Sequence, residues 1–229
     1  MLREIGEGAV VQVHENPYSS NTYIVVSGTH ALVVDPGIST TDEVCEVRRF
    51  LEVSGVRDVY VIHTHMHFDH VASTAVLRRY LSSRGFRVLV LHHRSEAEYL
   101  ERGDNYVTLA VPFFDSVLEP TQIDLVVTDG YKVSIGEYTV EVIHTPGHTI
   151  GSICLVVPKL RVVFTGDTVF SDGVPGRVDV PTSSPRDLVS SLLKLRSRLH
   201  GEYLVLPGHG RLYRGLLEEL IERCLRYLA

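Results

Sequence analysis

Cysteine is scarce in this sequence, and its scarcity excludes two kinds of site. The chain of 229 residues has three cysteines, Cys45, Cys154 and Cys224, which lie far apart and form no CxxC pair. An odd number at such spacings indicates neither a disulfide framework nor a thiolate metal site. We expect Cys154, inside the apolar run 153–157, to lie in the core. A metal ion in this protein would therefore be held by nitrogen and oxygen atoms.

Long apolar runs and a surplus of basic residues are also missing. No apolar run approaches the ~20 residues that cross a bilayer, and residues 1–4 lack the layout of a signal peptide. The formal net charge is -6, whereas a protein that binds nucleic acid needs a basic footprint. We therefore expect a cytoplasmic protein that acts on a small molecule, with neither nucleic acid nor membrane as a partner. The sequence leaves the oligomeric state open.

The motifs of two common catalytic classes are absent as well. The sequence has no Gly-x-Ser-x-Gly, which disfavours a serine hydrolase of the α/β type, and no Walker-type phosphate loop. Methionine, asparagine and glutamine are few, which favours a thermophilic source.

The pattern of apolar residues predicts one domain over residues 1–229 that alternates strands and helices. Runs rich in β-branched residues predict strands over 9–13, 22–26, 31–34, 59–62, 88–91, 139–143, 152–157, 161–164 and 203–206. Helical spacing predicts helices over 41–53, 69–84, 184–199 and 212–228. Residues 95–118 are predicted to form a short helix and a long loop. This order favours an α/β fold in which two mixed β-sheets pack face to face with helices outside, an αββα sandwich.

Histidine is abundant, with 12 residues, and it is concentrated in His63-Thr-His65-Met-His67-Phe-Asp69-His70. In an extended segment, residues two apart point to the same side, so His65 and His67 can converge on one ion. Asp69 and His70 turn away at the start of a helix and can face a second ion. By chance, an HxHxDH string is expected on the order of 10⁻³ times in such a chain. Imidazole and carboxylate ligands suit Zn, Fe and Mn. His63 lies outside the motif, and we expect it to have a structural or hydrogen-bonding role.

Three more candidate ligands lie on glycine-containing turns that follow predicted strands. They are His148 in Thr145–Thr149, Asp167 in Gly166–Thr168 and His209 in Pro207–Gly210. Each is a weak signal alone, but loops at strand ends can gather around one cleft.

The combined pattern resembles the metallo-β-lactamase superfamily. The resemblance rests on His65-x-His67-x-Asp69-His70 followed by His148, Asp167 and His209, and it spans the chain from Asp35 to His209. Within the superfamily it is similar to the single-domain members of the glyoxalase II-like branch. The stretch from Gly166 to Asp179 is also similar to persulfide dioxygenases. The resemblance implies the metallo-β-lactamase fold.

The resemblance also implies a ligand set. The first metal would take His65, His67 and His148, the second would take Asp69, His70 and His209, and Asp167 would bridge both. Asp69 and Asp167 are accordingly the candidate catalytic residues. The implied cofactors are two divalent ions, zinc in the first place and Fe or Mn as alternatives, which share a hydroxide when about 3.5–4 Å apart. Asp35 either supports this site or simply forms an Asp-Pro-Gly turn.

The activity that the resemblance implies is hydrolysis of a thioester or related ester of a small metabolite. The alternative is a mononuclear iron enzyme similar to persulfide dioxygenases, using His65, His67 or His148 with Asp167. A scaffold without activity is disfavoured because the ligand set is intact. Two-domain glyoxalase II enzymes continue into a helical region that binds glutathione, whereas only residues 210–229 follow His209, so we do not expect glutathione specificity. We expect residues 95–118 to cover the metal cleft, with Phe113 and Phe114 either lining an acyl pocket or anchoring the loop.

Overall fold

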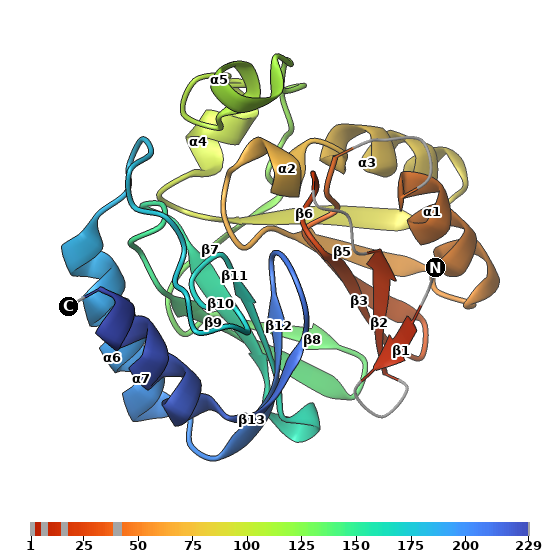
Figure 1. Ribbon diagram of the computed structural model, residues 1–229. Helices are drawn as coiled ribbons and strands as arrows, with labels where there is room; N and C mark the ends of the chain where they lie inside the picture. Colours follow the sequence, from red (N-terminus) through yellow and green to blue (C-terminus); the bar gives the residue numbers. More distant parts are fainter. Residues whose placement is uncertain (1–2, 6–8, 15–17, 39–42, 229) are drawn as a thin grey trace.

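Two β-sheets facing each other form the centre of the molecule (Figure 1). The computed structural model describes residues 3–5, 9–14, 18–38 and 43–228. Within these residues the first sheet has seven strands in the order β1 (Arg3–Ile5), β2 (Val10–His14), β3 (Thr22–Ser27), β4 (His30–Val34), β5 (Asp58–Ile62), β6 (Arg87–His93) and β7 (Leu125–Val127). The second has six in the order β13 (Tyr213–Leu216), β12 (Glu202–Pro207), β11 (Val162–Gly166), β10 (Ile153–Val157), β9 (Tyr138–His144) and β8 (Lys132–Ile135).

Both sheets are mixed, as the sequence predicts. In the first, β1 to β4 are antiparallel and β4 to β7 are parallel. In the second, β11 and β12 run parallel and the other pairs are antiparallel. The parallel pairs matter for the site, because they place the carboxyl ends of several strands at the same edge.

Helices cover the outer face of each sheet (Figure 1). Helices α1 (Glu43–Val53) and α3 (Thr74–Ser83) pack against the first sheet, and α6 (Pro185–Arg198) and α7 (Leu217–Tyr227) against the second. Strand β4 shows why the layers form: Val33 faces the helices, whereas Leu32 and Val34 face the second sheet. Side chains alternate along a strand, so a strand that is apolar on both faces is buried on both faces. The predicted αββα sandwich is confirmed.

Three predicted elements differ from the structure. The helix predicted over 69–84 divides into α2 (Phe68–Val71) and α3, because the backbone N–H of Ser73 donates to Gly37 O at 2.9 Å. The closing helix begins at Leu217, since residues 213–216 pair with β12 as strand β13. The segment 95–118 contains two short helices, α4 (Ala97–Glu101) and α5 (Ala110–Phe114), which lie at the top of the molecule in Figure 1.

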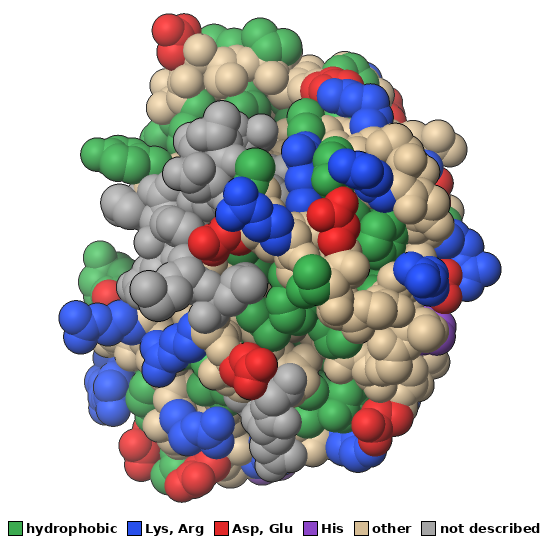
Figure 2. Space-filling view, turned by 90° about the vertical axis from the view of Figure 1, so that its right-hand side faces the viewer, with side chains coloured by type: hydrophobic (Ala, Val, Ile, Leu, Met, Phe, Trp, Pro, Cys, Tyr) green, Lys and Arg blue, Asp and Glu red, His purple; other side chains and the backbone are tan. Residues whose placement is uncertain are grey.

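The surface shows mixed charge. On the face drawn in Figure 2, basic and acidic side chains are interspersed with apolar ones. None of the helices in the described part of the chain has the length and apolar character that a bilayer crossing requires.

The ends of four strands meet at one edge of the sandwich. Asp35 follows β4, His63 follows β5, Gly166 ends β11 and Pro207 ends β12. Two backbone hydrogen bonds join the sheets there: Ile153 N donates to Thr64 O at 2.8 Å and Asn21 N donates to Gly208 O at 2.6 Å. Ligands bind characteristically outside the carboxyl ends of strands, so this edge is the place to look for a site.

Candidate metal centre

His65, His67 and His148 form a buried group that we name the first triad. His65 and His67 lie in the segment that follows β5, where His67 has extended backbone, and His148 comes from the loop between β9 and β10. His65 Nε2 and His67 Nδ1 are 3.0 Å apart, and His67 Nδ1 and His148 Nε2 are 3.0 Å apart. Nitrogen ligands about 2.0–2.1 Å from one tetrahedral ion lie at about this spacing from each other. The spacing therefore fits a common metal ion.

The neighbours of the first triad leave its nitrogen lone pairs free. The Thr64 hydroxyl donates to Asp35 at 2.7 Å and so accepts from His65 Nδ1 at 3.2 Å, which leaves the lone pair on His65 Nε2. His148 Nδ1 donates to Arg177 O at 2.8 Å, which leaves the lone pair on His148 Nε2. Burial, followed by repulsion from neighbouring histidines, holds the pKa of His65 and His67 well below the ordinary value. Neutral imidazoles are the form that binds metal.

Asp69, His70 and His209 form a second group, named the second triad. Asp69 Oδ2 lies 3.0 Å from His209 Nε2, and His70 Nε2 lies 3.3 Å from His209 Nε2. Burial alone would lower the pKa of His70, but the carboxylates of Asp69, Asp35 and Asp167 raise it to about 10. Burial would likewise raise the pKa of Asp69, but His70 and His209 lower it. In the second triad, a protonated imidazole therefore balances the negative charge of the carboxylates.

Asp167 lies between the two triads. Its Oδ1 is 3.4 Å from His70 Nε2, and its Oδ2 is 3.6 Å from His148 Nε2 and 3.7 Å from His209 Nε2. Oδ1 is buried without a hydrogen-bond partner among the described residues. A buried carboxylate oxygen without a partner is costly, and a cation would supply what is missing.

Glycine at position 208 makes room for this carboxylate. A Cβ on Gly208 would lie 2.2 Å from Asp167 Oδ1 and 2.7 Å from His70 Cε1. The Pro207–Gly210 turn therefore brings His209 to the site and also keeps Asp167 and His70 unobstructed.

Asp35 supports the site and does more than form a turn. Its side chain accepts from Thr64 N and Thr64 Oγ1 at 2.7 Å each and from His70 Nδ1 at 2.9 Å. Its backbone has a φ of 50°, in the left-handed region that non-glycine residues rarely adopt. The bond to Nδ1 directs Nε2 of His70 towards Asp69, Asp167 and His209. Asp35 thus orients a candidate ligand.

The structure brings together all seven residues named from the sequence. The groups able to hold an ion within the described residues are His65–His67–His148, His65–His70–Asp167 and Asp69–His70–His209, and none contains cysteine. His63 does not join them: it contacts His92 and Thr74 instead. Sequence reasoning missed His92 and Glu96, which are fully buried behind the first triad.

The segment 95–118 packs directly on the motif. Phe68 N donates to Thr108 O at 2.8 Å, and the Phe68 and Phe114 rings are 5.3 Å apart. The guanidinium of Arg177 lies 5.0 Å from the centre of the Phe113 ring. Helix α5 therefore contacts Phe68, which follows His67, and Arg177, whose carbonyl oxygen accepts from His148.

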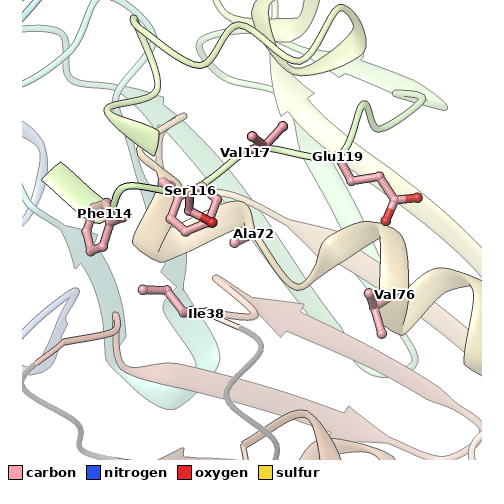
Figure 3. Close-up of a pocket in the computed structure, with 8 residues that line it drawn as sticks. Ile38, Ala72, Val76, Phe114, Ser116, Val117 and Glu119 are labelled. Atoms are coloured by element: carbon pink, nitrogen blue, oxygen red, sulfur yellow. The ribbon is translucent and has the colours of Figure 1, made fainter. Parts of the chain in front are cut away.

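A pocket of about 360 Å³, lined by apolar side chains together with Ser116 and Glu119, lies between α5 and the start of α3 (Figure 3). Figure 3 shows Phe114, Ser116 and Val117 on one side and Ala72 and Val76 on the helical side. The remaining lining residues are Ile38, Phe68 and Glu119. Of the two phenylalanines named from the sequence, Phe114 lines this pocket, whereas Phe113 is 53% exposed.

Taken together, the geometry suits a pair of divalent cations. Such a pair can activate water and polarise a carbonyl without a nucleophilic side chain.

Comparison with known proteins agrees with this chemistry. Residues 16–209 match the family model of the metallo-beta-lactamase superfamily. The probable metallo-hydrolase MJ0888 of Methanocaldococcus jannaschii is 30% identical over 207 residues, covering 89% of this chain and 93% of the relative. The human acyl-coenzyme A thioesterase MBLAC2 is 28% identical over 240 residues, covering 90% of this chain and 80% of the human protein.

Among solved structures, TTHA1623 in a di-iron-bound form is similar, with a TM-score of 0.74 and 27% identity. The match covers 94% of this chain and 98% of that protein. The family match includes all seven candidate ligands, and the two faced sheets are the fold of that family. The chain therefore belongs to the metallo-β-lactamase superfamily.

Proposed function

We propose that this protein is a dinuclear metal-dependent hydrolase that cleaves a thioester, or a related ester, of a small cytoplasmic metabolite. The observation that carries the proposal is the meeting of two ligand triads at Asp167, whose Oδ1 is buried and has no hydrogen-bond partner in the described part of the chain. One carboxylate placed between two groups of nitrogen and oxygen donors is the arrangement that a metal pair requires.

The ligands of the proposed site have separate tasks. His65, His67 and His148 would hold one ion, Asp69, His70 and His209 would hold the other, and Asp167 would serve both. When bound, the metal pair would supply Lewis acidity, which lowers the pKa of water and polarises a carbonyl. The chain itself orients the donors: Arg177 O fixes His148 and Asp35 fixes His70.

Asp69 is suited to receive the proton of the attacking water. Its side chain is 15% exposed, so it reaches the open side of the site, and its Oδ2 lies 3.0 Å from His209 Nε2. A thiolate leaves without strong acid catalysis, so we assign no general acid to the leaving group.

Two observations support a thioester with an apolar acyl group. The human relative is named as an acyl-coenzyme A thioesterase. The pocket lined by Phe68 and Phe114 lies beside α2, the helix that carries Asp69 and His70. We propose zinc as the metal, with iron or manganese as alternatives.

A mononuclear iron oxygenase similar to persulfide dioxygenases is the second candidate. The similar structure TTHA1623 shows that a relative can hold iron, although there as a pair of ions. One observation favours a single-ion site: the first triad alone already offers three histidines. In this case Asp69, His70 and His209 would have no direct task.

One experiment separates the two functions. The protein is stripped of metal, loaded separately with Zn(II), Mn(II) and Fe(II), and analysed for metal content. Release of thiol from acyl-coenzyme A substrates is then followed without oxygen, and O₂ uptake is followed with a persulfide. We expect two ions per chain and thiol release with Zn(II). Less than one ion per chain, or activity only with Fe(II) and O₂, would overturn the proposal.

A further inference from the structure

A row of buried polar side chains lies behind the first triad, and the proposed chemistry does not use it. It consists of Thr74 in α3, His63 after β5, His92 in β6 and Glu96 just before α4. All four are 0% exposed. A buried polar side chain costs free energy unless it is hydrogen-bonded, so the partners of each member of the row decide what the row can do.

The direction of each hydrogen bond in the row can be assigned. The Thr74 hydroxyl donates to Val71 O at 2.6 Å, so it accepts from His63 Nε2 at 2.8 Å. His63 Nδ1 is then the acceptor for His92 Nδ1 at 3.2 Å. His92 Nε2 donates to Glu96 Oε2 at 3.2 Å. Every member therefore fixes the hydrogen on its neighbour.

The row ends on the loop that carries His148. Glu96 Oε1 accepts from Gly151 N at 2.7 Å. A Cβ on Gly151 would lie 2.6 Å from both Cδ and Cγ of Glu96, so the loop backbone is closed directly against the carboxylate. Burial would raise the pKa of Glu96, but its hydrogen bonds to His92, Thr149 and Gly151 lower it. The carboxylate therefore accepts from both sides.

The row connects segments that belong to different sheets. His63 directly follows β5 of the first sheet and lies two residues before His65. Gly151, which donates to Glu96, lies three residues after His148 in the loop between two strands of the second sheet. The second triad has a different support, since Asp35 holds His70. No hydrogen bond or ion pair joins Asp69 or His209 to the row within the described part of the chain.

We propose that Glu96, through His92 and His63, is a positioning residue that fixes the His148 loop relative to His65 and His67, and so sets the metal affinity of the first triad. This inference rests on the proposed metal function, and it extends that function to residues outside the seven candidate ligands. Partners that orient ligands from outside a metal site typically change metal affinity by about 10–100-fold.

The test isolates each triad. His209→Ala leaves the first triad complete, and His148→Ala leaves the second. Glu96→Ala is added to each, and Co(II) affinity is measured by competition with a chelator while the visible spectrum is recorded. We expect Glu96→Ala to weaken Co(II) binding about 10–100-fold and to alter the spectrum in the His209→Ala protein. In the His148→Ala protein we expect no change.

Two further variants make the result specific. In Glu96→Gln the amide oxygen can still accept from Gly151 N and the amide N–H can donate to His92, so most of the affinity should return. Gly151→Ala should weaken binding like Glu96→Ala, because its methyl group displaces the loop; it also serves if Glu96→Ala does not fold. Asp124→Ala is the matched control, since Asp124 accepts from Val90 N in β6 at 2.8 Å and lies on the same sheet.

A readout without metal separates this inference from the proposed function. In the metal-free protein, hydrogen exchange of residues 145–152 should be faster in Glu96→Ala than in Asp124→Ala. Failure of the parent protein to bind metal would refute the proposed function, and hydrogen exchange would still decide the role of Glu96. Unchanged Co(II) affinity and unchanged exchange in Glu96→Ala, or equal losses in Asp124→Ala, would refute the positioning role.

Discussion

The two triads differ in how the protein shields them from water and protons. The histidines of the first triad are buried, and burial with mutual repulsion lowers the pKa of His65 and His67. In the second, His209 is 31% exposed and carboxylates raise the pKa of His70 to about 10. The first triad is thus ready to accept a cation, whereas the second holds a proton in its place. Histidines therefore take part in two sites whose metal binding depends differently on pH.

The largest effect is expected where the two triads meet. Asp167→Asn removes a carboxylate charge that lies within 3.7 Å of histidines of both triads, so we expect activity to fall more than about 100-fold, beyond the range of changes outside the ligand set. The measurement is kcat/KM for an acyl thioester together with metal content. Wild-type activity of the variant at full metal loading would contradict the assignment of Asp167.

The second largest effect is expected in the pH dependence of metal binding, which should differ between the two triads. A metal ion must displace the proton of His70, so the affinity of the second triad should fall as the pH falls below about 10. For one proton the loss is tenfold per pH unit, or about 100-fold between pH 9 and pH 7. The first triad has no proton to displace in this range, because the pKa values of its histidines are lowered. Chelator competition on His209→Ala and His148→Ala proteins measures both, and parallel slopes would contradict the comparison.

Asp35→Asn should weaken metal binding at the second triad more than at the first. The amide can still accept from Thr64 N, but an oxygen that serves both Thr64 Oγ1 and His70 Nδ1 is replaced by a donor. We expect the metal affinity of the second triad to fall about 10–100-fold and that of the first to change less. Metal titration of the variant shows whether one or both equivalents weaken.

The smallest expected effect concerns substrate selection. Phe114→Ala enlarges the pocket that Phe114 shares with Phe68, and we expect kcat/KM for a long-chain acyl thioester to fall by about tenfold while the acetyl thioester is little affected. Phe113→Ala is the matched comparison, since Phe113 is 53% exposed. A loss of thermal stability without a change in chain-length preference would show that Phe114 only anchors the loop.

Ligands that lie close together in the sequence can be predicted from it, whereas contacts between residues far apart in the sequence cannot. His65, His67, Asp69 and His70 lie within six consecutive residues, so strand and helix geometry alone predict their convergence. Glu96 and Gly151 are separated by 55 positions and His63 and His92 by 29. No periodicity connects such pairs, and only the packing of the sheets shows them.

The same limit explains the errors in the fold. Residues 69–84 keep a helical apolar pattern, but the bond from Ser73 N to Gly37 O interrupts the helix from outside. Residues 213–216 precede an amphipathic helix and become strand β13 only because β12 offers an unpaired edge. In both cases a backbone partner far along the chain overrides the local preference.

The origin of the ligands in both sheets has a consequence for folding. His65, His67, Asp69 and His70 follow a strand of the first sheet, whereas His148, Asp167 and His209 follow strands of the second. A metal pair held between them would bind only when the two sheets are assembled, and it would act as a crosslink across the core. By mass action, free metal at 100 times its dissociation constant stabilises a folded protein by about 2.7 kcal/mol per site. The melting temperature of this protein would then depend on the free metal concentration. Loss of the metal would lower the stability of the fold and the activity together.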